Sequence, residues 1–332
     1  MEGWRIQHSS MRVPTALLAV FLLVFPVLSQ EPTIKVDVDI VNVLCSVRNK
    51  SGGLIANLAK DDFSIFENGQ KQEIRYFARE TDLPLTIGLL VDVSLSQERL
   101  IEEERRAAYQ FFSAVLGPKD LAFLISFGKD SELLQDYTNS RKLLQKGLDE
   151  LRVNAPVGGL QPGPVPTMNT PRGTVLFDTV YLASAEQLKG QVGRKALVIL
   201  TDGVDQGSRY KLEDAIKAAQ RADAIVYGIY YADPGAYGYG GFGSFGTPSD
   251  RDLKRLAEDT GGRVLRVDRK HTLQEIFKEI QEEMRSQYAI GYSPTNSTKD
   301  GGFRKLDIKV ASKDYKVQAR KGYFAVPAGA SE

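Results

Sequence analysis

The sequence is poor in the residues that build soft-metal sites and disulfide frameworks. Its 332 residues include two histidines and one cysteine. These counts exclude a cysteine-based zinc site, a disulfide within the chain and any site that needs several histidines. Charge of one sign is not in excess either, because 43 Lys and Arg accompany 42 Asp and Glu, for a formal net charge of +1. This balance excludes a broadly basic nucleic-acid binder, although it does not exclude a local charged patch.

Long apolar runs are also missing, with one exception near the amino terminus. Residues 15–28 (TALLAVFLLVFPVL) follow Arg5 and Arg12 and precede the small residue Ser29. A basic start, a short apolar stretch and a small-residue cleavage site are typical of a signal peptide, here residues 1–29. We therefore expect an exported protein, periplasmic or secreted, with an uncleaved signal anchor as the alternative. No second run is long enough to span a membrane.

Three zones of different hydrophobic pattern define the expected domains. Residues 31–82 are strand-like and contain Asn68-Gly69, a strong hairpin signal. Residues 83–285 alternate apolar strand-type runs with helical periodicity, which favours βαβ crossovers and a doubly wound, mainly parallel sheet. Residues 286–325 return to strands. Because neither end has enough strands to bury a face, we expect both ends to form one small β-sandwich that carries the α/β domain as an insertion.

Two long loops are rich in glycine and proline, at residues 154–173 and 233–250. We expect both loops to flank the carboxyl ends of the strands. Residues 238–243 (GYGGFG) fit the dinucleotide-binding pattern G-x-G-x-x-G. However, the next helix opens only after Pro248, too late for its N-terminus to meet a pyrophosphate at those glycines. The aromatic residues of this loop favour a recognition role, and a glycine-rich insertion without a role is the alternative.

The strongest chemical signal is the sequence DVSLS, where an apolar strand ends and a helix begins. Asp92, Ser94 and Ser96 place one carboxylate and two hydroxyls at the carboxyl end of a strand. Ligands of open α/β sheets bind at these strand ends, and oxygen ligands suit a hard divalent cation. Plain helix capping explains the same residue types, because Ser and Asp are favoured at helix N-termini. The motif alone does not separate the two interpretations.

Two further segments favour the metal site. Thr201-Asp202-Gly203 follows the apolar run ALVIL, and Thr174 stands just before a predicted helix. We expect both on the same strand-end face as Asp92. With these residues the chain resembles the von Willebrand factor A domain, whose metal-ion-dependent adhesion site (MIDAS) uses Asp-x-Ser-x-Ser, a loop Thr and an Asp after a later strand. The resemblance implies a metal site composed of Asp92, Ser94, Ser96, Thr174 and Asp202.

The resemblance extends to almost the whole mature chain. From about residue 36 to residue 324 the sequence is similar to a bacterial von Willebrand A-related family abundant in Acidobacteria. The matching segments are LAKDDFSIFENGQKQEIRYF, LPLTIGLLVDVSLS, RGTVLFDTV, RKALVILTDGVD, RSQYAIGYSP, FRKLDIKV and ARKGYFA. This resemblance implies an exported protein and a fold, but it identifies no ligand.

The residue types predict how such a site works. Ser94 and Ser96 would ligate the cation directly, Thr174 directly or through water, while Asp92 and Asp202 would hold coordinating waters. A site with few protein ligands favours Mg²⁺, with Mn²⁺ or Ca²⁺ as substitutes. One coordination position stays open for an outside oxygen, most naturally from a Glu or Asp of a protein partner.

The expected function is therefore an exported, metal-dependent protein-binding module for adhesion or scaffolding, and not an enzyme. A metal-dependent hydrolase is the alternative, but it needs a general base, and no histidine lies in the motif loops. An envelope scaffold with a vestigial metal site is the third interpretation. Cys45, alone in the run VNVLCSV, is expected to be a buried strand residue, with pairing between two chains as the alternative.

Overall fold

The structure is a computed structural model that describes residues 40–79, 83–153, 173–233 and 249–326. All of them belong to one compact unit, Val38–Glu332. The predicted signal peptide and most of both long loops lie outside the described residues. Among those that are described, no helix combines the length and the apolar character needed to cross a membrane.

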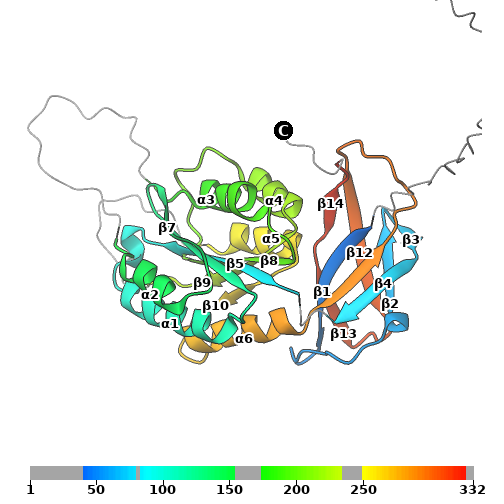
Figure 1. The fold of residues 1–332 in the computed structure, drawn as a ribbon, viewed down its shortest axis with the longest axis horizontal. Helices are drawn as coiled ribbons and strands as arrows, with labels where there is room; N and C mark the ends of the chain where they lie inside the picture. Colours follow the sequence, from blue (N-terminus) through cyan, green and yellow to red (C-terminus); the bar gives the residue numbers. More distant parts are fainter. Residues whose placement is uncertain (1–39, 80–82, 154–172, 234–248, 327–332) are drawn as a thin grey trace, which may run out of the picture. The chain divides into compact units, whose positions relative to one another are not determined.

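A six-stranded sheet forms the centre of the α/β part (Figure 1). Its strands, in spatial order, are β10 (Val264–Arg266), β9 (Ala224–Tyr230), β8 (Arg194–Thr201), β5 (Leu85–Asp92), β6 (Leu121–Phe127) and β7 (Ser131–Thr138). Neighbouring strands pair in parallel from β10 to β6, and β7 is antiparallel to β6. The prediction of a mainly parallel sheet is confirmed. The strand β7 was not expected, because its sequence SELLQDYT has neither a continuous apolar run nor a strict alternation.

Helices cover both faces of this sheet (Figure 1). One face packs against α1 (Ile101–Val115), α2 (Arg141–Asp149) and α6 (Leu273–Arg285), the other against α3 (Leu176–Leu182), α4 (Leu212–Arg221) and α5 (Arg251–Thr260). Strand β5 divides its side chains accordingly, with Leu89 and Val91 in the first core and Leu90 in the second. Every residue of β5 and β8 is buried. This two-sided burial is why both strands read as continuous apolar runs.

Strands from both chain ends build a β-sandwich. One sheet has the order β13 (Tyr315–Ala319), β1 (Val41–Asn49), β11 (Tyr288–Tyr292) and β4 (Ile74–Arg79). The other has the order β14 (Gly322–Phe324), β12 (Phe303–Val310), β2 (Phe63–Glu67) and β3 (Gln70–Gln72). The two sheets share one apolar core, to which Val43, Ile65, Ile290 and Ile308 contribute. The predicted fold class, a doubly wound α/β sheet inserted in a small sandwich, is confirmed.

The hairpin predicted at Asn68-Gly69 is present, and its second strand is the three-residue β3. Asn68 and Gly69 adopt positive φ angles of 49° and 83°, and they connect β2 to β3. The following strand β4 leaves this sheet and pairs with β11 in the other one. Cys45 is a buried residue of β1, and burial raises the pKa of its thiol to about 12.

A buried carboxylate joins the last helix of the α/β part to the sandwich. Glu283 of α6 is fully buried and accepts hydrogen bonds from Arg48 of β1 (2.6 Å) and Arg263 (2.7 Å). Gln318 of β13 donates a further bond at 3.0 Å. Because α6 ends at Arg285, just before β11, this cluster fixes the point where the chain returns to the sandwich.

Candidate metal centre

The two aspartates of the predicted site stand at the ends of neighbouring parallel strands. Asp92 is the last residue of β5 and fully buried, and Asp202 follows β8 directly with 1% of its surface exposed. The register pairs Val91 with Leu200, so the two strands end at the same level. The carboxyl ends of adjacent parallel strands therefore bring both carboxylates together, as the sequence pattern predicts.

Hydrogen bonds connect these aspartates through the two serines. The Ser94 N–H donates to Asp92 Oδ1 (2.9 Å), the Oγ atoms of Ser94 and Ser96 lie 3.0 Å apart, and Ser96 Oγ donates to Asp202 Oδ2 (2.6 Å). Thr201 Oγ1 donates a further hydrogen bond to the other carboxylate oxygen, Asp92 Oδ2 (2.6 Å). Four of the five predicted residues are thus in one connected cluster, which we call the strand-end cluster: Asp92, Ser94, Ser96 and Asp202.

Thr174, the fifth predicted residue, is placed beside this cluster by its backbone. Its carbonyl oxygen accepts hydrogen bonds from the N–H groups of Gln206 (3.0 Å) and Gly207 (3.1 Å), in the loop that follows Asp202. Its side chain is buried, and within the described residues no hydrogen bond joins its hydroxyl to the four others. The structure therefore puts Thr174 in an adjoining loop, and the described residues show no hydrogen bond between its hydroxyl and the cluster.

The two carboxylates repel each other in a site that water does not screen. Burial, followed by the Asp202 charge, raises the pKa of Asp92 to about 7, although hydrogen bonds from Thr201 and Ser94 act in the opposite direction. A cation between the two carboxylates would remove this penalty. The cluster offers only oxygen atoms, and the described residues contain no group of three or more His, Cys, Asp and Glu placed to hold a metal. Such a donor set fits a hard cation that keeps several waters, and it does not fit a cysteine- or histidine-based zinc site.

Gly203 allows the chain to turn away directly after Asp202. Its φ angle is +79°, and a Cβ atom added there would lie 2.3 Å from the carbonyl oxygen of Ser249. Only glycine adopts this conformation without strain and leaves room for that neighbouring backbone. The glycine therefore permits the turn by which the chain leaves Asp202 and passes close to Ser249.

Two nearby aspartates brace loops instead of joining the cluster. Asp205 Oδ1 accepts hydrogen bonds from Ser208 Oγ (2.5 Å) and the Phe177 N–H (3.2 Å). Asp178 Oδ1 accepts from two backbone N–H groups, of Arg209 and Tyr210, at 2.8 Å each. Both carboxylates thus hold the loop after β8 against the start of α3.

Sequence reasoning missed a third carboxylate near the cluster. Glu104 of α1 is fully buried, and burial, Asp92, Glu103 and Asp202 together raise its pKa well above the usual value. The signal was present in the sequence: Glu104 lies three residues before Ala107 and seven before Phe111, on the apolar stripe of the helix. A carboxylate on such a stripe points to a polar environment inside the fold.

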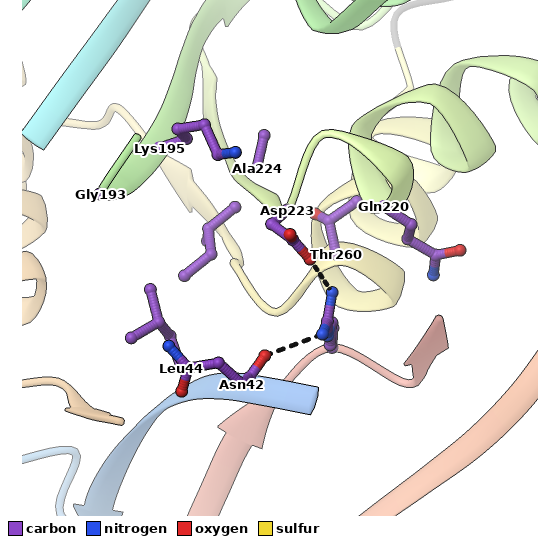
Figure 2. A pocket seen from close by; sticks show the side chains of 10 residues that line it. Asn42, Leu44, Gly193, Lys195, Gln220, Asp223, Ala224 and Thr260 are labelled. Atoms are coloured by element: carbon purple, nitrogen blue, oxygen red, sulfur yellow. Dashed lines mark hydrogen bonds and ion pairs between the residues drawn. The ribbon is translucent and has the colours of Figure 1, made fainter. Parts of the chain in front are cut away.

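A second candidate region is a cavity of about 110 Å³ near the amino ends of β8 and β9 (Figure 2). Lys195, Asp223 and Arg320 supply its charged lining. Arg320 is paired with Asp223 and also donates to the carbonyl oxygen of Asn42 (2.8 Å), while Lys195 donates to the carbonyl oxygen of Gln191 (3.2 Å). These cations already have protein partners, so we interpret the cavity as a structural junction.

Comparison with known proteins identifies no family and finds only distant solved structures. No family model matches the chain, and no curated protein matches its sequence. Among solved structures, the BatB protein of Bacteroides thetaiotaomicron is similar, with 18% identity over 60% of this chain and 97% of that one, at a TM-score of 0.43. The SpRpn10 VWA domain has 13% identity over 60% and 95% of the two chains, at a TM-score of 0.39.

A third similar structure is proximal thread matrix protein 1 from the mussel byssus, described with a zinc-occupied MIDAS motif. It has 13% identity over 66% of this chain, the match spans half of that protein, and the TM-score is 0.47. These likenesses are too distant to support an argument about function. By its own sheet order and strand-end cluster, the chain is a von Willebrand A-like α/β protein.

Proposed function

We propose that this protein is an exported, non-enzymatic binding module that captures an acidic group of a protein partner through a divalent cation. The observation that supports this most strongly is the strand-end cluster itself. Asp92 and Asp202 are buried and near each other, whereas Ser94 and Ser96 are partly exposed. A cation held there would be anchored by charges on the inner side and would be reachable from solvent on the serine side.

The proposed cation is Mg²⁺, with Mn²⁺ or Ca²⁺ as substitutes. Ser94 and Ser96 would supply direct ligands, Asp92 and Asp202 would balance the charge and hold waters, and Thr174 would contribute from the adjoining loop. Hydroxyl oxygens donate little charge, so such a cation keeps an affinity for an anionic oxygen from outside. A carboxylate of a partner meets this need, and Leu95, 39% exposed between the two serines, offers an apolar contact beside it.

A binding role agrees better with the chemistry of the site than a hydrolytic one. Hydrolysis at a metal needs a base with access to the attacking water. The only histidine after the signal segment is His271, which pairs with Glu279 of α6 at 3.1 Å, and the motif loops contain none. A metal-dependent hydrolase and a scaffold with a vestigial site stay as alternatives. The first predicts turnover of phosphoesters or peptides with Mg²⁺, and the second predicts no divalent binding at all.

We further propose that the protein belongs to the bacterial von Willebrand A-related family that its sequence resembles. The amino-terminal segment supports export to the periplasm or the medium, with retention by an uncleaved signal as the alternative. The partner would then be another envelope or secreted protein that presents a Glu or Asp side chain.

A pulldown from envelope extract tests the proposal in four arms. The mature protein is immobilised and incubated in Mg²⁺ or in EDTA, the variant Ser94→Ala/Ser96→Ala is incubated in Mg²⁺, and one extract is treated to amidate its carboxylates. We expect capture only in the arm with Mg²⁺, intact serines and free carboxylates. Capture that persists in EDTA at full strength would show that the metal is not the recognition element.

A further inference from the structure

Two buried polar side chains near the strand-end cluster have no hydrogen-bond partner in the described part of the chain. Gln97 and Glu104 are both fully buried. The Oε1 and Nε2 atoms of Gln97 and both carboxylate oxygens of Glu104 lack partners there. Folded proteins rarely leave buried polar atoms unpaired, so these four atoms indicate water or an ion beside each side chain.

Backbone hydrogen bonds connect both residues to the segment that carries the serines. Gln97 ends the short helical turn Leu95–Gln97, and its N–H donates to the carbonyl oxygen of Ser94 (2.9 Å). The Leu100 N–H then donates to the Gln97 carbonyl oxygen (2.8 Å), and the Glu104 N–H to the Leu100 carbonyl oxygen (2.9 Å). Three successive backbone hydrogen bonds thus link the segment that carries Ser94 and Ser96 to Gln97 and then to Glu104.

Electrostatics show that Glu104 is close enough to sense the strand-end cluster. The charges of Asp92 and Asp202 both act on the Glu104 carboxyl, and that of Asp92 acts more strongly. Yet the three carboxylates are not placed to share one ion directly, because the described residues include no such acidic triplet. Glu104 is therefore near the cation position but not a direct ligand, which leaves water as the link.

We propose that Gln97 and Glu104 form the inner wall of the cation site, where they hold water molecules that complete the coordination of the divalent cation. This inference rests on the proposed function, because it needs a cation at the strand-end cluster. Water bound to a divalent cation is a strong hydrogen-bond donor, and the Glu104 carboxylate and the Gln97 carbonyl are acceptors. A divalent cation at the strand-end cluster would offset the repulsion that raises the pKa of Glu104, and it would therefore favour the charged carboxylate.

Isothermal titration with Mn²⁺ tests the inference on the mature protein. The variant Glu104→Gln keeps the shape of the side chain and removes its charge. The matched control is Glu102→Gln, because Glu102 is an exposed residue of the same helix and pairs with Arg105. Residues that hold metal ligands in place typically account for 10- to 100-fold in metal affinity. We expect Glu104→Gln to weaken Mn²⁺ binding at least about 10-fold, whereas Glu102→Gln should match the wild type.

The melting temperature in EDTA separates this role from a structural one. Because Glu104 has no described protein partner to lose, Glu104→Gln should melt in EDTA at or above the wild-type temperature. Lower metal affinity together with unchanged stability supports the inference. A loss of stability in EDTA with unchanged Mn²⁺ affinity overturns it. Should Glu104→Gln fail to fold, Gln97→Leu decides: Mn²⁺ affinity equal to that of the wild type overturns the inference.

The same titration distinguishes the inference from the proposed function. If the wild type binds Mn²⁺ and Ser94→Ala/Ser96→Ala does not, while Glu104→Gln binds like the wild type, the metal site stands and the inner wall is refuted. If the wild type binds no Mn²⁺, both are refuted. The water-proton relaxation of bound Mn²⁺ adds a direct readout, because Glu104→Gln should change the exchange of water on the ion.

Discussion

Removing the two serine hydroxyls should separate metal binding from folding. In Ser94→Ala/Ser96→Ala the variant loses the contact between the two hydroxyls (3.0 Å) and the bond from Ser96 to Asp202 (2.6 Å). A neutral hydrogen bond contributes about 0.5–1.5 kcal/mol and one to a charged group about 1.5–3 kcal/mol, so the loss is about 2–4.5 kcal/mol. A domain is stable by about 5–15 kcal/mol, and β5 and β8 keep their fully buried cores. The variant should therefore stay folded.

The metal response gives the larger contrast. At a Mg²⁺ concentration of about 100 times Kd, binding stabilises the wild type by about 2.7 kcal/mol. For a protein of this size, with an unfolding entropy of about 2.1 cal/mol/K per residue, such a gain raises Tm by roughly 4 °C. Differential scanning calorimetry in Mg²⁺ and in EDTA should show this difference for the wild type and none for the double variant.

A matched control excludes a general loss of stability as the explanation. Ser140→Ala removes the N-cap of α2, where the serine hydroxyl accepts from the Leu143 N–H, and such a loss costs about 1 kcal/mol. This control should melt at a lower temperature and keep its full response to Mg²⁺. If the double variant kept the wild-type difference between Mg²⁺ and EDTA, the serines would not be ligands and the reasoning would fail.

The remaining predictions concern pH, the domain junction and the turn after β8. The folded pKa of Asp92 is about 7, above its ordinary value of 3.8, so protonation of this carboxyl favours the folded state. Without metal, this stabilising contribution is fully present below about pH 4 and is lost as the pH rises through 7. In EDTA, the melting temperature of Asp92→Asn should therefore rise relative to that of the wild type between pH 4 and pH 8, and a constant difference would contradict this. The Mg²⁺ affinity of the wild type, measured by titration, should fall below pH 7. Glu283→Ala leaves two arginines without their buried partner and should destabilise by about 3–5 kcal/mol in urea unfolding, whereas the exposed Glu282→Ala should change little. Gly203→Ala forces a Cβ into a positive-φ position and should lower the free energy of unfolding by about 1–3 kcal/mol. It should also weaken Mg²⁺ binding. Stability and Mg²⁺ affinity equal to those of the wild type would refute the proposed role of this turn.

Local pattern was enough to predict the central sheet. The runs LTIGLLV and ALVIL are apolar without interruption because both faces of β5 and β8 are covered by helices. Strand β7 escaped prediction because it lies at the sheet edge and is only partly buried. The pairing of β4 could not be predicted for another reason. Its partner β11 is far away in sequence, and long-range pairing leaves no local signature.

The candidate site was predictable where residue type and strand end coincide. Asp92, Ser94, Ser96 and Asp202 follow two buried strands directly, so their meeting follows from the parallel register. Thr174 depends on how an adjoining loop is placed, which spacing alone does not define. Glu104 was missed because a glutamate in a helix is usually exposed, and only its place on the apolar stripe shows otherwise.

The most direct test of the metal site is a crystal of the mature protein grown with Mn²⁺ and measured at the manganese absorption edge. The proposed function predicts one anomalous peak at the strand-end cluster, within bonding distance of the hydroxyl oxygens of Ser94 and Ser96, and no peak there in crystals of Ser94→Ala/Ser96→Ala. A peak at another position, or none at this cluster in the wild type, would contradict the claim that these residues bind a cation.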